Sequence, residues 1–264
     1  MIYAISDIHG ADKAYFKLKD KVGFNANDEM YIIGDIFDGN NKNPAAVMSI
    51  IEDIQKNDNI HCLCGNHEIQ HYNYQTTDNA EDKAMFYEYL VEPMCAGKPL
   101  LDYFKKNPDD CKKAMDFISE LETSVLIKVR NMYFYLVHGS PVIYNPNEMH
   151  EYEWLMNALS IRADFEVDLV SAVKSDPNET INKKYQADVN LYNLFAIVGH
   201  IPTKYYIEDN YEDKYQRLYI RNQIIDIDCG CRANSLGKAY NKDDLRSNLC
   251  MYNISRNEPI YYKD

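Results

Sequence analysis

The sequence predicts an α/β fold, because strand and helix patterns alternate along its first third. Short apolar runs at residues 2–6, 30–33 and 60–63 have the length and the bounded form of buried strands. Between them, residues 11–22 and 44–55 carry apolar side chains at helical spacing. Strands joined by single helices indicate βαβ units, and therefore a partly parallel sheet.

Local signals support the helices of this part. Gly23 follows residues 11–22 and is a frequent helix stop, since glycine adopts the left-handed conformation at low cost. Pro44 lies in the first turn of the second helix, where its missing N–H does no harm. Residues 79–122 are mostly helical in pattern and highly charged. We interpret them as a solvated, cap-like insertion that could also cover a site and select substrates.

The second half carries mostly strand patterns. Residues 125–129 and 133–138 form a predicted hairpin with Arg130 and Asn131 at its turn, and residues 148–160 form a predicted helix. Further strands are expected at residues 195–198, 205–207, 218–221, 224–228, 249–254 and 259–262. This order has the character of a β-meander at its end, and it fits two packed sheets flanked by helices. The chain length allows one large domain of residues 1–264.

Composition and charge narrow the classes of partner. The net charge of −13 repels nucleic acids and anionic membranes, and we find no basic patch that would offset it. No apolar run reaches the roughly 18 residues of a membrane helix. The first strand pattern begins at the N-terminus and is soon followed by Asp7, which is unlike a signal peptide. We therefore expect a cytoplasmic protein whose seven cysteines are reduced.

Five segments place Asp, Asn or His directly after a predicted strand. They are Asp7-Ile8-His9-Gly10, Gly34-Asp35-Ile36-Phe37-Asp38-Gly39, Gly65-Asn66-His67-Glu68, His138-Gly139 and Gly199-His200. Loops converge at strand ends of open α/β sheets, so these side chains should meet. Six of the ten glycines lie in these segments (Gly10, Gly34, Gly39, Gly65, Gly139, Gly199). Glycine allows close approach of the backbone to a ligand.

These residue types suit a pair of divalent cations. Two metals ~4 Å apart need a bridging carboxylate and further oxygen and nitrogen ligands. A set of carboxylate, amide oxygen and imidazole favours Mn, Fe, Zn or Ni, with Mn the expected metal in vitro, over Mg or Ca. A hydroxide between the metals would attack phosphorus in line, and a histidine would protonate the leaving group.

The ordered set of five segments resembles the calcineurin-like metallophosphoesterases, and most closely the bacterial members of serine/threonine phosphoprotein phosphatase type. The family pattern D-x-H-G, G-D-x-x-D, G-N-H-E, H-G and G-H is met at every ligand position, and residues 197–203 resemble V-G-H-T-P-T. The resemblance covers most of the chain. It implies an αββα fold of two mixed sheets packed as a sandwich, and hydrolysis of a phosphate ester without a covalent intermediate.

The resemblance also implies residue roles. Asp7 and His9 would bind the first metal and Asp35 would bridge both. The second metal would be held by Asn66, which would also contact the substrate, together with His138 and His200. His67 would be the general acid, and Asp38 the carboxylate that orients it.

The chain departs from the family at two arginines that normally grip phosphate. Gly39 stands where Arg follows the second Asp, and Cys64 stands where Arg precedes G-N-H-E. Arg162, in a segment that resembles a third arginine motif, could still contact phosphate. A guanidinium donates two parallel hydrogen bonds, so losing both arginines weakens binding of a doubly charged monoester more than of a diester.

Three functions follow. The first is a phosphomonoesterase of protein phosphatase type, acting on a phosphoprotein or a small phosphoester. The second is a phosphodiesterase or a dinucleoside polyphosphate hydrolase; Glu68 in place of Asp lacks the mark of the symmetrical bacterial hydrolases. The third is a non-catalytic metal-binding protein, which the proton donor His67 argues against. The sequence leaves the oligomeric state open.

Overall fold

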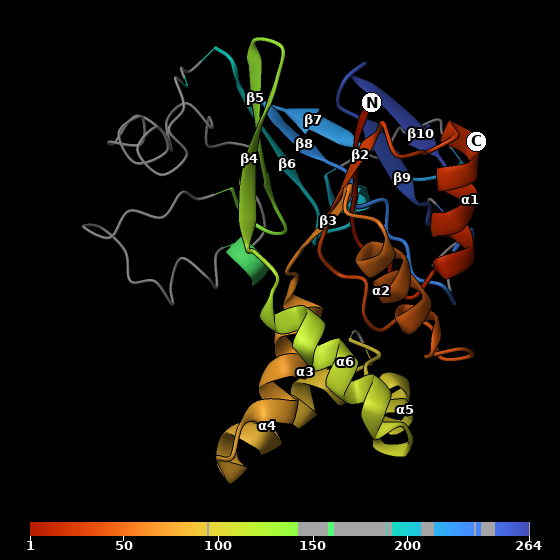
Figure 1. Ribbon diagram of the computed structural model, residues 1–264, viewed down its shortest axis with the longest axis vertical. Coiled ribbons are helices and arrows are strands. Elements are labelled where there is room, and N and C mark those ends of the chain that lie inside the picture. The colour runs from red at the N-terminus through yellow and green to blue at the C-terminus, as the bar shows by residue number, and fades with distance from the viewer. Residues whose placement is uncertain are drawn as a thin grey trace.

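Two five-stranded sheets form the computed structural model, which describes residues 1–93, 95–141, 158–160, 189, 192–206, 214–234, 236–238 and 246–263. The first sheet has the strand order β10-β9-β1-β2-β3, and the second has the order β4-β5-β6-β8-β7. Figure 1 shows the two sheets side by side, with α1 and α2 beyond the first sheet. Both sheets contain parallel and antiparallel pairs. The predicted α/β class with two mixed sheets is therefore confirmed.

The first sheet is built by the βαβ units that the sequence predicts. Its three parallel strands are β1 (Ile2–Ile5), β2 (Glu29–Ile33) and β3 (Ile60–Leu63). The helices between them are α1 (Asp12–Val22) and α2 (Ala46–Lys56). Gly23 ends α1 in the left-handed conformation, with φ 63°, as expected. The sheet is completed by two antiparallel strands, β9 (Cys250–Asn253) and β10 (Glu258–Tyr261).

The second sheet begins with the predicted hairpin. Its strands β4 (Ser124–Val129) and β5 (Met132–Val137) pair in an antiparallel manner, and Arg130 at the turn has φ 57°. The strands β6 (Leu194–Val198) and β8 (Ile224–Asp226) continue the sheet in parallel with β5, and β7 (Tyr219–Arg221) closes the edge. Three parallel strands therefore lie together in each sheet.

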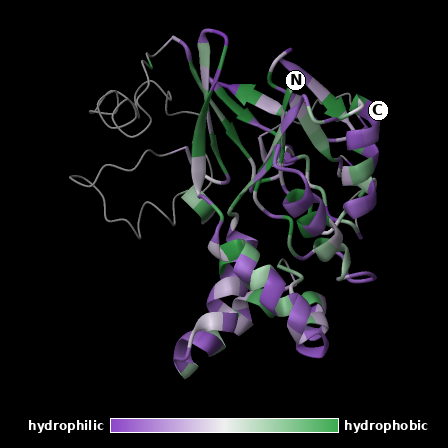
Figure 2. Cartoon of the chain, in the orientation of Figure 1, coloured by the Kyte–Doolittle hydropathy of each residue, from purple (hydrophilic) through white to green (hydrophobic). Residues whose placement is uncertain are grey.

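Successive side chains of a strand point to opposite faces of its sheet, and this divides the core into two layers. In the layer between the sheets, Ala4 and Ile33 of the first sheet pack with Phe134, Leu136 and Ile197 of the second. The neighbouring residues of β1 and β2 face the other way, and they pack against α1 and α2 (Tyr3, Ile5, Met30, Ile32). Burial of one such large side chain stabilises the fold by about 1.5–3 kcal/mol. Figure 2 shows the strands largely hydrophobic and the outer faces of the helices largely hydrophilic.

Four helices extend from the end of β3. They are α3 (Asn66–Thr76), α4 (Ala80–Val91), α5 (Lys98–Lys106) and α6 (Pro108–Ser119). Asn79 caps α4 by accepting hydrogen bonds from the backbone N–H groups of Glu81 and Asp82. The helix α6 packs into the core beside α2, through side chains such as Phe117 and Ile118. Helices α4 to α6 lie within the expected insertion at 79–122; its role as a cap stays a prediction.

Two expectations at the C-terminal end were wrong. A strand was expected at 205–207, but Tyr205 ends a 3-10 turn, Thr203–Tyr205. In this turn the Tyr205 N–H donates to the Pro202 carbonyl at 3.0 Å. Residue 207 lies outside the described residues. The last strands also form no meander, because β9 and β10 join the first sheet rather than the second. Of the helix expected at 148–160, only residues 158–160 are described, and they are helical. No helix in the described ranges has the length and apolar composition that crossing a bilayer needs.

Candidate active site

The predicted ligands meet because they follow parallel strands. Asp7 follows β1, Asp35 follows β2, Asn66 begins α3 after β3, His138 follows β5 and His200 follows β6. Parallel strands end at the same edge of a sheet, and the two sheets present these ends to each other. The structure therefore brings together side chains that lie up to 193 positions apart, such as Asp7 and His200.

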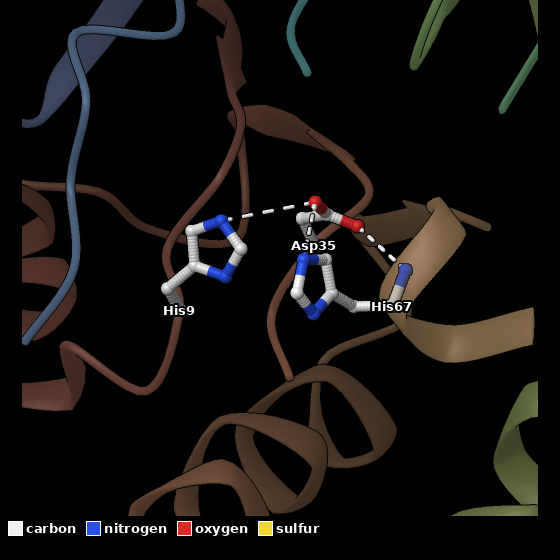
Figure 3. A group of neighbouring side chains, drawn as sticks. All are labelled: His9, Asp35 and His67. Carbon is white, nitrogen blue, oxygen red and sulfur yellow. Dashed lines mark hydrogen bonds and ion pairs between the residues drawn. The ribbon is translucent and has the colours of Figure 1, made fainter. Parts of the chain in front are cut away.

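Asp35 lies at the centre of the group. Its Oδ2 is 3.3 Å from His138 Nε2, 3.7 Å from His9 Nε2 and 3.8 Å from His67 Nε2. Among the described residues, two sets of three side chains could each hold a metal ion, and both include Asp35: one with His9 and His67, the other with His138 and His200. Figure 3 shows the first set, with both imidazole rings turned toward the Asp35 carboxylate. Sharing one carboxylate is the arrangement that two neighbouring cations need.

Each histidine ring is oriented by a hydrogen bond on its far side. His9 Nδ1 donates to the Phe37 carbonyl at 2.9 Å, and His138 Nδ1 donates to the Ile33 carbonyl at 2.8 Å. His200 is reversed: its Nε2 donates to the Ser160 carbonyl at 3.0 Å, so that Nδ1 faces the centre. A histidine that gives one ring N–H to a carbonyl offers the lone pair of the other nitrogen, which is the usual state of a metal ligand.

The amide of Asn66 is oriented in the same way. Its Nδ2 donates to the Tyr89 hydroxyl at 3.0 Å, which leaves Oδ1 facing inward. That oxygen is 3.0 Å from His138 Nε2 and 2.9 Å from His200 Nδ1. An amide oxygen and two imidazole lone pairs are all acceptors, so a cation or a proton must lie between them. Tyr89 belongs to α4, and the sequence interpretation did not include it.

Asp7 lies beside these sets rather than within them. Its Oδ1 is 3.9 Å from His9 Nε2, and both carboxylate oxygens accept from the His200 backbone N–H, at 3.2 and 3.1 Å. Burial raises the pKa of Asp7 to about 6, and the charge of Asp35 adds to the rise. A second buried carboxylate, Asp228, follows β8, and burial together with the charge of Asp7 raises its pKa well above the usual range. Acidic side chains are therefore crowded at the site, and a bound cation would favour their charged forms.

His67 has both ring nitrogens engaged. Nδ1 lies 2.7 Å from Asp38 Oδ2, while Nε2 faces Asp35. Asp38 has a second partner, since its Oδ1 is 2.8 Å from Nε2 of His71. His71 is fully buried and packs against Phe37. Although burial alone would raise it, the two histidines hold the pKa of Asp38 well below its usual range.

Glu68 fixes the loop that carries Asp35. Its carboxylate is fully buried and accepts four backbone hydrogen bonds. Oε2 accepts from Asp35 and Gly65, each at 2.8 Å, while Oε1 accepts from Ile36 at 2.9 Å and Phe37 at 3.1 Å. The bond to Gly65 also caps the N-terminus of α3. One side chain therefore orients two of the five ligand-bearing segments.

Burial and nearby carboxylates together separate the histidines into two groups, one with lowered and one with raised pKa values. Burial lowers the pKa of His9 to about 3 and that of His200 to about 4, so both rings are neutral at pH 7, as metal ligands must be. For His67 and His138, burial acts in the same direction but nearby carboxylates outweigh it. Asp35 and Asp38 raise the pKa of His67 to about 9, and Asp35 raises that of His138 to about 10. To act as a ligand, His138 would release this proton when a cation binds.

The positions of the missing arginines are closed by packing. A Cβ atom at Gly39 would lie 2.7 Å from both the Cβ and the carbonyl oxygen of His9, and Gly39 has φ 73°. An arginine cannot take this position without moving the loop. Cys64 is buried, and burial raises the pKa of its thiol well above the usual range. Arg162, the third candidate, lies outside the described residues.

The donor set fits two divalent cations. Two ligands about 2.1 Å from one metal and at right angles to each other are about 3 Å apart, which is close to the separations of Asp35, Asn66 and His138 described above. All six predicted ligands are buried or nearly so. The oxygen and nitrogen atoms of five of them converge, and Asp7 lies beside these five. The metals, if bound, would be held by residues of both sheets.

Comparisons with known proteins agree with this geometry. The sequence profile of one family, described as calcineurin-like phosphoesterase, matches residues 1–204. A hypothetical protein from Pyrococcus horikoshii OT3 has a similar structure, with a TM-score of 0.54 and 13% identity over 99% of this chain and 87% of that chain. A protein proposed to be a diadenosine tetraphosphatase has a TM-score of 0.52 and 13% identity over 98% of this chain and 91% of that chain. Identities this low show a shared fold alone. No curated protein sequence matches the chain.

Proposed function

The chain belongs to the calcineurin-like phosphoesterase family, and from this premise we propose that it is a phosphomonoesterase of serine/threonine phosphatase type. Membership makes it a metal-dependent phosphoester hydrolase. The observation that supports a catalytic rather than a structural centre is the contact of His67 with Asp38 at 2.7 Å, beside the shared carboxylate of Asp35. A purely structural metal site has no use for a proton donor.

The proposed ligands divide between the two cations. Asp7 and His9 would hold one cation and Asp35 would contribute to both. The ligands of the other would be Asn66, His138 and His200. When bound, the cations would lower the pKa of a bound water and neutralise the phosphoryl oxygens. We propose Mn²⁺ for assays in vitro, since the mixed oxygen and nitrogen donors also suit Fe, Zn or Ni.

The protein's own groups handle the proton. His67 donates the proton on Nε2 to the leaving oxygen. Asp38 accepts the Nδ1–H and so holds the ring with Nε2 toward the substrate. Asn66 contacts the phosphate through the same amide that Tyr89 orients. Arg162 is a further proposed phosphate contact.

A diester substrate is the second candidate. The chain has Gly39 and Cys64 where related phosphatases carry arginine, and the space at Gly39 is filled by His9. A charge-assisted hydrogen bond contributes about 1.5–3 kcal/mol, and a diester with one negative charge depends on it less than a monoester with two. Phosphodiesters and dinucleoside polyphosphates therefore remain alternatives, as does a nucleotide monoester.

One substrate panel separates these functions. Purified protein with Mn²⁺ is offered p-nitrophenyl phosphate, bis-p-nitrophenyl phosphate and diadenosine tetraphosphate. We expect the highest kcat/KM for p-nitrophenyl phosphate. Preference for the diester or for the dinucleotide would refute the monoesterase, and silence on all three with Mn²⁺ bound would favour the binding protein.

A further inference from the structure

A loop from the C-terminal part of the chain lies against the two loops that carry His9 and Gly39. Cys231 Sγ is 3.6 Å from the Ile8 carbonyl, and the Ala233 N–H is 3.4 Å from the His9 carbonyl oxygen. Asn234 contacts the Gly39 carbonyl twice, through its backbone N–H at 3.3 Å and its Nδ2 at 2.9 Å. Residues 231–234, which include Arg232, are therefore held against both of these loops.

Arg232 brings positive charge to the face of the site where His9 and His67 meet. Its side chain is partly buried. Burial is the main cause of the lowered pKa of His9, and the charge of Arg232 acts in the same direction. On His67 the same charge opposes the rise that the carboxylates cause, and it also acts on Cys95, which precedes α5. The positive charge of Arg232 therefore acts on groups from three separate segments of the chain.

The chemistry of the site needs such a group. The two phosphate-gripping arginines of related phosphatases are replaced by Gly39 and Cys64, and Asn234 hydrogen-bonds to Gly39 itself. A guanidinium in the neighbouring loop can present its planar fork to the same substrate oxygens without entering the filled space at Gly39. The loop contacts fix the backbone of this arginine, which reduces the entropy that an ordered contact costs.

We propose that Arg232 is a substrate-binding residue, which hydrogen-bonds to non-bridging phosphoryl oxygens in place of the arginines absent from positions 39 and 64. The proposal rests on the proposed function for its substrate class, a phosphate ester. It applies to the phosphoryl group alone, so inorganic phosphate is a sufficient probe.

Phosphate binding tests the proposal directly. The protein saturated with Mn²⁺ is heated in increasing concentrations of inorganic phosphate, and Kd is taken from the rise in Tm. Loss of one charge-assisted hydrogen bond should raise the phosphate Kd of Arg232→Ala about 10- to 150-fold, and loss of two should raise it further. Arg232→Lys, which keeps the charge without the fork, should lie between this variant and the wild type. Arg221→Ala, at an exposed position of β7, should bind phosphate as the wild type does.

A structural role would give a different pattern. Arg232→Ala could disturb the loop, so Mn²⁺ affinity and Tm without phosphate are measured for it and for Arg232→Met, which retains the length of the side chain. Normal phosphate binding by Arg232→Met would overturn the proposal, as would a wild type that binds no phosphate. Hydrolysis of p-nitrophenyl phosphate that is unchanged in Arg232→Met refutes Arg232 but leaves the proposed function intact. If phosphate binding depends on Arg232 but the protein hydrolyses none of the three substrates, the role of Arg232 stands and the proposed function is refuted.

Discussion

Replacement of Glu68 by glutamine should destabilise the protein strongly although the two side chains have the same shape. Each carboxylate oxygen of Glu68 accepts two backbone hydrogen bonds, so all four donors are satisfied by one anion. A glutamine has only one acceptor oxygen. Its NH₂ group would face two N–H donors, either those of Asp35 and Gly65 or those of Ile36 and Phe37, and neither pair can reach water.

The size of the loss follows from the bonds that cannot be remade. Two hydrogen bonds to a charged group contribute about 1.5–3 kcal/mol each, which gives an expected loss of about 3–6 kcal/mol. Whole domains are stable by only about 5–15 kcal/mol. The variant should therefore be close to its folding limit, and the loop that holds Asp35 should lose its order first.

Equilibrium unfolding in urea measures this loss, and Mn²⁺ titration of the folded fraction measures its effect on the site. Glu52→Gln is the matched control, because Glu52 is exposed and pairs with Lys56 at 3.3 Å on the surface of α2. Such a surface pair contributes less than about 1 kcal/mol. A Glu68→Gln variant within 1 kcal/mol of the Glu52→Gln variant (on the order of one surface pair) would show that the four bonds do not hold the loop.

Three further changes test the roles within the site. Asp35→Asn should lower Mn²⁺ affinity more than about 100-fold, since changes outside the ligand set alone cost about 10- to 100-fold; metal content after dialysis checks this, and retained metal would contradict it. His67→Asn should keep two Mn²⁺ ions bound and lower kcat about 10²- to 10⁴-fold, whereas loss of one ion would make His67 a ligand. Tyr89→Phe should weaken Mn²⁺ binding about tenfold by freeing the Asn66 amide; Tyr87→Phe, at an exposed position of the same helix, is the control, and equal affinities in the two variants would rule out this role for Tyr89.

The positions of the proposed ligands were predictable because each lies shortly after a strand in the sequence. A strand such as residues 60–63 is visible from its apolar run alone, and the order of parallel strands then fixes which ends meet. Asp35 and Asn66 needed no knowledge of the tertiary structure beyond this rule, because β2 and β3 are neighbours in one sheet. His138 follows a strand of the other sheet, so its approach to Asp35 also depends on how the two sheets pack. The same locality explains why β1 to β3 and their helices were placed within a few residues of their observed bounds.

The supporting residues could not be found in this way. Tyr89 reaches Asn66 only because α4 folds back on α3, and Arg232 reaches the site only through contacts with a loop 223 positions earlier in the chain. The pairing of β9 with β1 is equally remote. His71 is different, because it lies four residues after His67 on the same helix, and this spacing places both rings on one face. That signal was present in the sequence and could have identified the second partner of Asp38.

The backbone at the site explains why Asp and His recur there. Asp7, His9, Asp35, Asp38 and His200 all have positive φ, between 46° and 74°. A side chain other than glycine held there costs about 1–3 kcal/mol, with Asp, Asn and His among the residues that tolerate it best. The strain is sustained because hydrogen bonds such as those of Glu68 determine the loops independently of any ligand. Each proposed ligand among them must therefore satisfy two conditions, a left-handed backbone and a side chain that can bind a metal, and Asp and His are residues that meet both. Glutamate would meet only the second condition, since it is not among the residues enriched at positive φ.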